Sequence, residues 1–319
     1  MLFFIWRDLM SLQSNTGITN AQKEILDLEK RYFDLLFKIV NSDSFKTDLL
    51  NIEREISDRY HDYANVWNLK NKLKNPAERL VLHHMYTNPL INNKITGLYT
   101  SAVSSDIGLQ TEDVVLCVDV KTNDLIGNRG DHNRITAEKN QISFANTNYP
   151  LVNTTANLDK NSRYKPHNPI LTYVVKIGYA DDGTRFNLVK SDLGTFTIQV
   201  ACVPNGNLGS LFNNNILTGF KTYSYKDEVD PNPSFIKYYP DKDTCIQDLQ
   251  SRYSLIPNVD KEAYRDISTG KVWVATTKAR RHCARIITSG STARLNTDIL
   301  TNRLDSTGAP WVGYKTITY

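Results

Sequence analysis

The chain has 319 residues, 40% of them hydrophobic, so it can bury a large core. Its net charge of +4 at pH 7 permits a polyanionic partner without requiring one. The sequence contains no P-loop, no Rossmann glycine fingerprint, no serine or cysteine nucleophile elbow and no zinc-ligand spacing, so we expect no ATP-driven, redox or zinc chemistry. The four cysteines are widely spaced, which is typical of small buried residues in a reducing cytoplasm.

The chain begins with an apolar segment and two amphipathic helices. The segment MLFFIWRD is too short to span a bilayer and no basic segment precedes it, so we expect neither a signal peptide nor a membrane anchor. Residues 20–40 place apolar side chains at helical spacing, and residues 43–63 continue in the same style. Both helices are expected to pack on the core or against a second subunit.

A third helix is predicted within residues 68–86, after a short run of lysines between positions 70 and 74. Pro76 marks the helix start and Glu78 lies in its first turn, which is ordinary helix-start chemistry. The lysines are expected on a solvated face, with a phosphate contact as the alternative.

The most strand-like segment follows this helix. Residues 114–118 form a continuous apolar run of β-branched character, which predicts a buried strand. Asp119 and Lys121 stand at its end and share one face, because side chains alternate along a strand. Two charged groups at the end of a core strand are costly unless something uses them.

A divalent cation is one possible use. A turn near residues 108–110 would fold Asp106 back beside Asp119, and two carboxylates suit Mg²⁺, with waters and a substrate phosphate in the other positions. Lys121 would then lie near the attacking water or the scissile phosphate. The alternative is a structural salt bridge between Asp119 and Lys121, with Asp106 in an ordinary turn. The pattern alone leaves both open.

The arrangement D-x12-D-V-K resembles the motif of the PD-(D/E)xK nuclease superfamily, with Ser105 where that motif prefers proline. Three segments are also similar, in the same order, to a type II restriction endonuclease of this superfamily. They are TEDVVLCVDVKT at 111–122, NQIS at 140–143 and ACVPNGNLGSLFNN at 201–214. The resemblance covers about the middle third of the chain.

This resemblance implies roles for particular residues. Asp106, Asp119 and Lys121 would be the catalytic trio, with Asp106 and Asp119 binding Mg²⁺. In the family a glutamate on a helix before the catalytic hairpin often supports the metal site, and Glu78 is the candidate here.

A polar segment leaves the predicted strand after Lys121, where sequence-reading side chains lie in this family. Asn and Gln can pair with adenine and Arg with guanine. The candidates are Asn128, Arg129, Asn133, Arg134, Asn140 and Gln141. The alternative for each of them is a solvated loop.

Further strands are predicted at residues 170–179 and 194–206, with a hairpin turn at 181–183. Together with residues 112–120 they predict an α/β (α+β) fold, in which a mixed central sheet is flanked by helices.

The C-terminal section is strongly basic. Between Lys271 and Arg303 there are seven basic residues and one acid. A solvated surface is the default interpretation, and a DNA-facing strip is the alternative. Arg280, Arg281 and Arg285 are the candidates for DNA contact.

We therefore expect one large nuclease domain, with an N-terminal helical region at 1–66, a catalytic core at 67–220 and an irregular, basic, DNA-binding region at 221–319. The resemblance implies a homodimer that cuts double-stranded DNA at a short palindromic site, continuous or interrupted, beside a cognate DNA methyltransferase. Two alternatives stay open: a structure-specific repair or recombination nuclease, and a DNA-binding protein without catalysis.

Overall fold

A computed structural model describes residues 17–99, 105–125, 135–138, 165, 167–188, 197–212, 216–220, 261–265, 272–276 and 292–318. The chain forms two compact units. The first comprises residues 1–218 and 294–319, and the second comprises residues 219–293. The described part has no helix long and apolar enough to cross a membrane.

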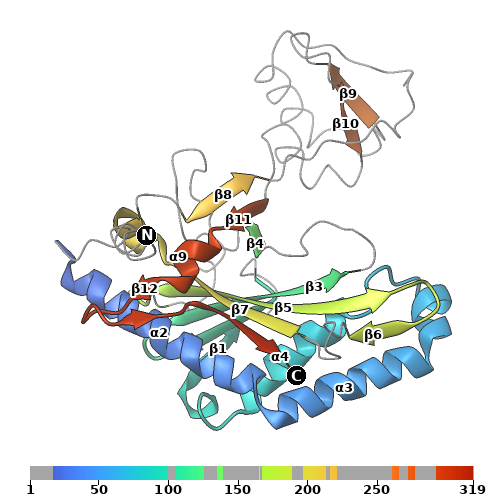
Figure 1. The fold of residues 1–319 in the computed structure, drawn as a ribbon, viewed down its shortest axis with the longest axis horizontal. Coiled ribbons are helices and arrows are strands. Elements are labelled where there is room, and N and C mark those ends of the chain that lie inside the picture. The colour runs from blue at the N-terminus through green and yellow to red at the C-terminus, as the bar shows by residue number, and fades with distance from the viewer. Residues whose placement is uncertain are drawn as a thin grey trace, which may run out of the picture. The chain divides into compact units, whose positions relative to one another are not determined.

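The first unit is built on a seven-stranded mixed sheet (Figure 1). Its strands are β1 (Ile95–Tyr99), β2 (Ile107–Thr111), β3 (Val115–Asp124), β5 (Ile170–Asp181), β6 (Phe186–Leu188), β7 (Thr197–Val203) and β14 (Tyr314–Thr318). The order is β1-β2-β3-β5-β7-β14, with β6 paired to β5. Strands β3 and β5 are parallel, and the other neighbours are antiparallel. The predicted mixed sheet is confirmed, and β14 extends it beyond the expected 67–220 core.

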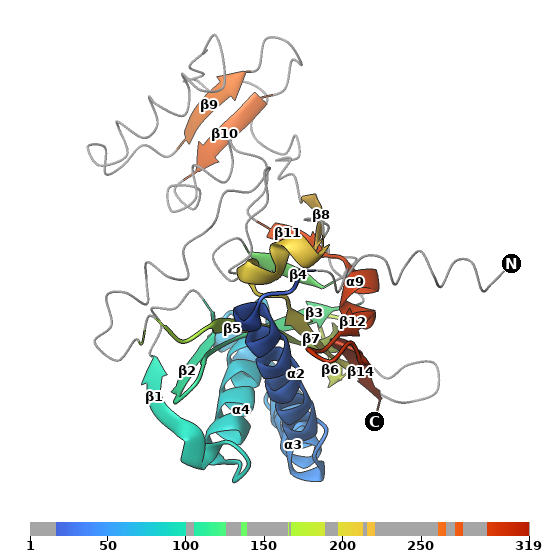
Figure 2. The same cartoon turned by 90° about the vertical axis from the view of Figure 1, so that its left-hand side faces the viewer.

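Three helices cover one face of the sheet (Figures 1 and 2). They are α2 (Asn20–Val40), α3 (Asp43–Asp58) and α4 (Lys74–Thr87). The predicted helices are confirmed, although α4 begins two residues before Pro76 and α3 ends at Asp58, before the π-helical turn η1 (Asp62–Val66). Thr19 and Gln22 form a capping box that fixes the start of α2.

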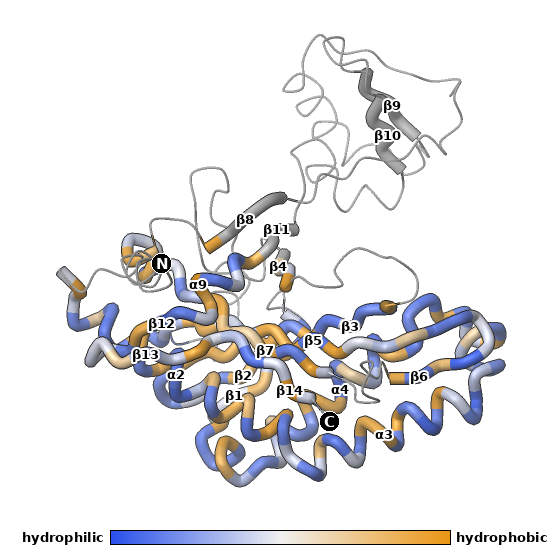
Figure 3. Tube along the Cα trace, in the orientation of Figure 1, coloured by the Kyte–Doolittle hydropathy of each residue, from blue (hydrophilic) through white to orange (hydrophobic). Residues whose placement is uncertain are grey.

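Register shows which side chains face the helices. Tyr173 on β5 pairs with Val118 on β3, and the Tyr173 hydroxyl donates to the backbone oxygen of Glu29 on α2 at 3.0 Å. Val118 and Val120 therefore point toward the helices, and Asp119 and Lys121 point away. Figure 3 shows apolar residues along β5 and β7, and polar and apolar residues interspersed along α2 and α3, as amphipathic packing requires.

Two ion pairs on the helix-covered face correct the sequence analysis. Lys72 is buried and its Nζ lies 2.5 Å from Asp181 of β5, so it does not lie on a solvated face. Arg303, at the end of the predicted basic strip, is fully buried and pairs with the buried Glu29 of α2. Arg303 therefore belongs to the core and does not lie on a surface that could face DNA. Local sequence missed both pairs because the partners are distant in the chain.

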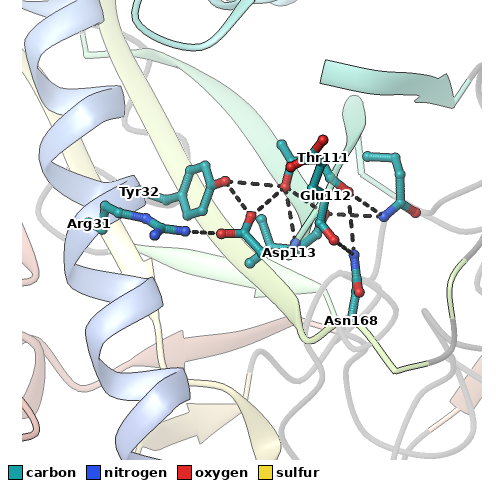
Figure 4. Close-up of polar contacts among 8 residues, drawn as sticks. Arg31, Tyr32, Thr111, Glu112, Asp113 and Asn168 are labelled. Atoms are coloured by element: carbon teal, nitrogen blue, oxygen red, sulfur yellow. Dashed lines mark hydrogen bonds and ion pairs between the residues drawn. The ribbon is translucent and has the colours of Figure 1, made fainter. Parts of the chain in front are cut away.

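The turn of the β2–β3 hairpin is anchored on two sides (Figure 4). The Tyr32 hydroxyl donates to Asp113 at 2.6 Å, and Arg31 also pairs with Asp113. On the other side the amide of Asn168, just before β5, donates to the backbone oxygen of Glu112 at 3.1 Å. These contacts fix the hairpin whose other end carries Asp106 and Asp119.

The remaining elements are short. They are β4 (Thr136–Glu138), β8 (Leu217–Phe220), β9 (Lys261–Arg265), β10 (Val272–Thr276), β11 (Thr292–Leu295), β12 (Arg303–Leu304), β13 (Pro310–Trp311), the helix α9 (Thr297–Thr301), and the 3-10 turns η2 (Asn92–Lys94) and η4 (Gly206–Phe212). β4, β11 and β8 form a small sheet in that order. In the second unit, β9 and β10 form an antiparallel pair.

Candidate active site

Asp119 and Lys121 lie near the end of β3 on the face turned away from the helices. The Lys121 ammonium is 2.7 Å from Asp119 Oδ2. Asp119 is 1% exposed, whereas 25% of the Lys121 side chain is exposed. The pair is therefore buried on its acidic side and open on its basic side.

Asp106 lies directly across the hairpin from Asp119. The β2–β3 register pairs Ile107 with Val118, and one further step along both strands places Asp106 opposite Asp119. Asp106 Oδ2 also accepts a hydrogen bond from the backbone N–H of Val120 at 2.7 Å, which orients its carboxylate against β3. Asp106 itself is exposed. Two carboxylates are thus held side by side at a strand end, one buried and one in contact with solvent.

The environment of Asp119 opposes its ionisation. Burial raises the pKa of Asp119 to about 7, the charge of Lys121 works against this rise, and the neighbouring Asp106 adds to it. A carboxyl group that titrates near neutral pH, beside a lysine and a second acid, is typical of sites where a cation or a substrate completes the charge balance.

Glu78 approaches the same group from α4. Burial raises the pKa of Glu78, the Asp106 carboxylate adds to the increase, and Lys74 and Lys121 oppose it. Its buried Oε1 accepts no hydrogen bond in the described part of the chain, and the nearest ammonium, Lys74 Nζ, is 4.0 Å away. The structure therefore brings Glu78 into the electrostatic neighbourhood of Asp106 and Lys121, which its place in the sequence could not show.

The donor set suits a hard divalent cation. Mg²⁺ commonly binds proteins through one or two carboxylates and keeps several waters, so Asp106 and Asp119 supply ligands of the right chemistry. Among the described residues, no group of three or more His, Cys, Asp or Glu side chains is arranged to hold a metal ion. Waters and substrate oxygens would have to fill the other positions.

The predicted DNA-reading residues lie outside the residues that the structure describes. They are Asn128, Arg129, Asn133, Arg134, Asn140, Gln141, Arg280, Arg281 and Arg285. Their roles stay predictions.

Sequence reasoning missed two residues on the face that carries Asp119. Asn123 follows Lys121 by two positions on β3, and Lys176 lies beside Lys121 in the β3–β5 register. Alternation along the strand could have singled out Asn123. Lys176 could not be found, because its neighbour on β3 is more than fifty positions away.

Two solved structures are among those to which this chain is similar. No family model matches the sequence, and no curated protein matches it. The restriction endonuclease BglI bound to its DNA recognition sequence is 12% identical, with 86% of this chain and 91% of that chain covered, at a TM-score of 0.38. The tetrameric restriction endonuclease SfiI bound to cognate DNA is 13% identical, with 96% and 97% covered, at a TM-score of 0.37.

Proposed function

We propose that this protein is a Mg²⁺-dependent endonuclease that hydrolyses phosphodiester bonds in double-stranded DNA. The observation that carries the proposal is the group around Lys121, in which Asp119, Asp106 and Glu78 all interact with one another or with that lysine. A structural salt bridge needs one carboxylate. Additional acids raise the cost of folding, which favours a site that a cation completes.

The residues would divide the work as follows. Asp106 and Asp119 hold Mg²⁺, which when bound lowers the pKa of a water molecule and stabilises charge on the scissile phosphate. Asp119 must lose its proton to act as a ligand, and the positive charge of the cation would favour that loss against the effect of burial. Lys121, with its ammonium partly exposed, donates to the scissile phosphate or assists the attacking water. Glu78, with one buried and unbonded oxygen, can accept a proton or orient a water.

We further propose that the chain is a type II restriction endonuclease acting as a homodimer at a palindromic site, with a cognate methyltransferase as its biological partner. The support is the resemblance of residues 111–122, 140–143 and 201–214 to such enzymes, together with a geometric argument. One candidate site per chain calls for two-fold symmetry to cut both strands of a palindrome.

The test is digestion of phage DNA by the purified protein with Mg²⁺, beside Asp119→Ala and a matched control, Asp34→Ala. Asp34 is a half-exposed carboxylate that pairs with Lys315 on the opposite face of the sheet. Discrete fragments from wild type and from Asp34→Ala, and none from Asp119→Ala, are expected.

Other outcomes separate the rival functions. Cleavage confined to junctions or flaps, without discrete fragments from linear DNA, would indicate a structure-specific nuclease. DNA binding by both wild type and Asp119→Ala without cleavage by either would make the Asp119–Lys121 pair structural and refute the nuclease proposal.

A further inference from the structure

Asn71 joins the start of α4 to the strand that carries Lys121. Its amide nitrogen donates to the Thr122 hydroxyl on β3 at 2.8 Å. Its amide oxygen accepts a hydrogen bond from the backbone N–H of Lys74, the first residue of α4, at 3.1 Å. Thr122 directly follows Lys121 in β3. One half-buried side chain therefore connects two elements that both contribute to the candidate active site.

The two hydrogen bonds explain why asparagine stands at this position. The first N–H groups of a helix have no partner within the helix, and an Asn side chain is among the best acceptors for them. The same amide group also carries two N–H donors, so it can bind the Thr122 hydroxyl as well. Leu73, the residue directly before α4, makes no side-chain hydrogen bond to the helix. Asn71 therefore both caps α4 and ties it to β3.

The next two residues attach the same segment to the core by other means. Lys72 is buried and its Nζ lies 2.5 Å from Asp181 of β5, and the Leu73 side chain is fully buried. Loss of the Asn71 hydrogen bonds therefore leaves this segment attached to the sheet through β5. What the bond from Asn71 to Thr122 adds is a fixed distance between the start of α4 and β3, at the residue next to Lys121.

The start of α4 matters because it carries Glu78. Four residues of helix separate Lys74 from Glu78 and span about 6 Å, so a shift at the start of α4 moves Glu78 as well. The charges of Asp106 and Lys121 both act on the Glu78 carboxylate. Its buried Oε1 accepts no hydrogen bond in the described part of the chain, and Lys74 Nζ is 4.0 Å away. The place of this oxygen therefore depends on the place of the helix.

Resting on the proposed nuclease function, we propose that Asn71 is a positioning residue that fixes Glu78 relative to Lys121 through its hydrogen bond to Thr122. Asn71 and Thr122 take no part in the chemical step, and their effect on the reaction passes through the placement of α4. A misplacement of about 1 Å can slow an enzymatic reaction by up to about a hundredfold. Loosening the start of α4 should therefore lower kcat.

Steady-state cleavage of a DNA duplex with Mg²⁺ tests the role of the bond to β3. Asn71→Ser keeps an oxygen for the Lys74 N–H but is too short to reach Thr122 as well. Thr122→Val removes the hydroxyl from the other side. Each should lower kcat about tenfold and leave KM unchanged, and the double variant should be no slower than either single one. The matched control is Asn88→Ala, which removes the oxygen that accepts from the Leu90 N–H at 3.0 Å beyond the other end of α4 and should keep kcat.

A second background separates positioning from a general loss of stability. Because Asn71 acts through Glu78, Asn71→Ser should lower kcat little further once Glu78→Gln is present. An equal tenfold loss in both backgrounds would mean that the two residues act independently, and it would overturn the proposal. Thermal unfolding of each variant checks that it is folded.

Hydrogen exchange gives a readout that does not depend on cleavage. The first turn of α4 should exchange faster in Asn71→Ser and Thr122→Val than in wild type, while the last turn is unchanged. Wild-type cleavage together with wild-type kcat in both variants overturns the positioning role and leaves the nuclease proposal intact. Faster exchange in both variants, with no cleavage by wild type, supports the tie between α4 and β3 and overturns the nuclease. Unchanged exchange in both variants overturns the tie itself.

Discussion

Two lysine–carboxylate pairs lie on opposite faces of the same sheet and differ in how well they are satisfied. Lys72 and Asp181 are both buried on the helix-covered face, with 6% and 9% of their side chains exposed. Asp181 also accepts hydrogen bonds from the Tyr60 hydroxyl at 2.6 Å and from the Gly183 backbone at 3.1 Å. Burial raises the pKa of Asp181, but the hydrogen bonds from Lys72, Tyr60 and Gly183 outweigh burial and hold that pKa below its usual range.

The pair on the other face has the opposite balance. Asp119 is buried more deeply than Asp181, yet its neighbours include a second carboxylate, Asp106, and its pKa rises to about 7. Its partner Lys121 remains partly exposed. The comparison shows that burial of an ion pair does not itself mark a site. A functional site is instead indicated by a buried acid whose surroundings oppose its ionisation, next to a cation that a substrate can still reach.

The largest expected effect is on catalysis. Lys121→Ala should lower the cleavage rate by about 10²–10⁴-fold, the range for loss of one acid–base or charge-stabilising group. Lys72→Ala serves as the matched control and should retain the rate per folded molecule. Single-turnover cleavage with Mg²⁺ measures both, and equal losses in the two variants would remove the distinction between the pairs.

The next effect is on stability. Asp181→Asn leaves Lys72 buried without a counter-charge and should lower the free energy of unfolding by about 3 kcal/mol or more. Asp119→Asn should not lower it, because burial disfavours the Asp119 carboxylate and Lys121 can reach water. Urea denaturation at neutral pH compares the two. If Asp119→Asn lost more free energy of unfolding than Asp181→Asn, the protein would stabilise the Asp119 carboxylate better than the Asp181 carboxylate, which would contradict the prediction.

The effect of pH on the free energy of unfolding should be smaller than the loss in Asp181→Asn. Asp119 and Asp181 should contribute to it with opposite signs. Between about pH 4 and 7 folded Asp119 holds a proton that the unfolded chain has lost, so its contribution to stability falls as pH rises through this window. Asp119→Asn should therefore gain stability relative to wild type between pH 5 and pH 8, by on the order of 2–3 kcal/mol. The lowered pKa of Asp181 contributes stability that is present at neutral pH and lost in acid. Urea denaturation at both pH values provides the measurement, and a wild type more stable than Asp119→Asn at pH 8 would contradict it.

The smallest expected change in stability comes from replacing both charged residues of an ion pair in the same variant. Lys72→Met combined with Asp181→Asn should return stability to within about 1 kcal/mol of wild type, since no buried charge remains unpaired. Lys121→Met combined with Asp119→Asn should be just as well folded and still fail to cleave DNA. Recovery of cleavage in the second double variant would exclude a catalytic role for the pair.

Local pattern predicted the elements whose signal lies in neighbouring residues. The apolar spacing of residues 20–40 predicted α2, and the run at 114–118 predicted β3 with Asp119 and Lys121 on one face. These predictions succeed because helix and strand periodicity act over a few residues.

What the sequence could not predict depends on distant partners. Arg303 looks like part of a surface strip until Glu29 is placed beside it, and β14 has a place in the sheet only because it pairs with β7. In the candidate site, Lys176 was missed for the same reason. The three-dimensional register supplies this information, and one sequence read along its length does not.

The segment between β7 and β14 that leaves the first unit begins with β8 and ends with β11, which are hydrogen-bonded to each other, and the Asn296 backbone N–H donates to the Ile216 backbone oxygen at 2.8 Å. In polymer terms, residues 217–295 form a closed loop whose ends are already fixed. Doubling the length of such a loop costs only about 0.6 kcal/mol of closure entropy. This point in the chain can therefore gain or lose sequence during evolution with little effect on the sheet, so that the segment can diverge while the face bearing Asp119 and Lys121 keeps its geometry.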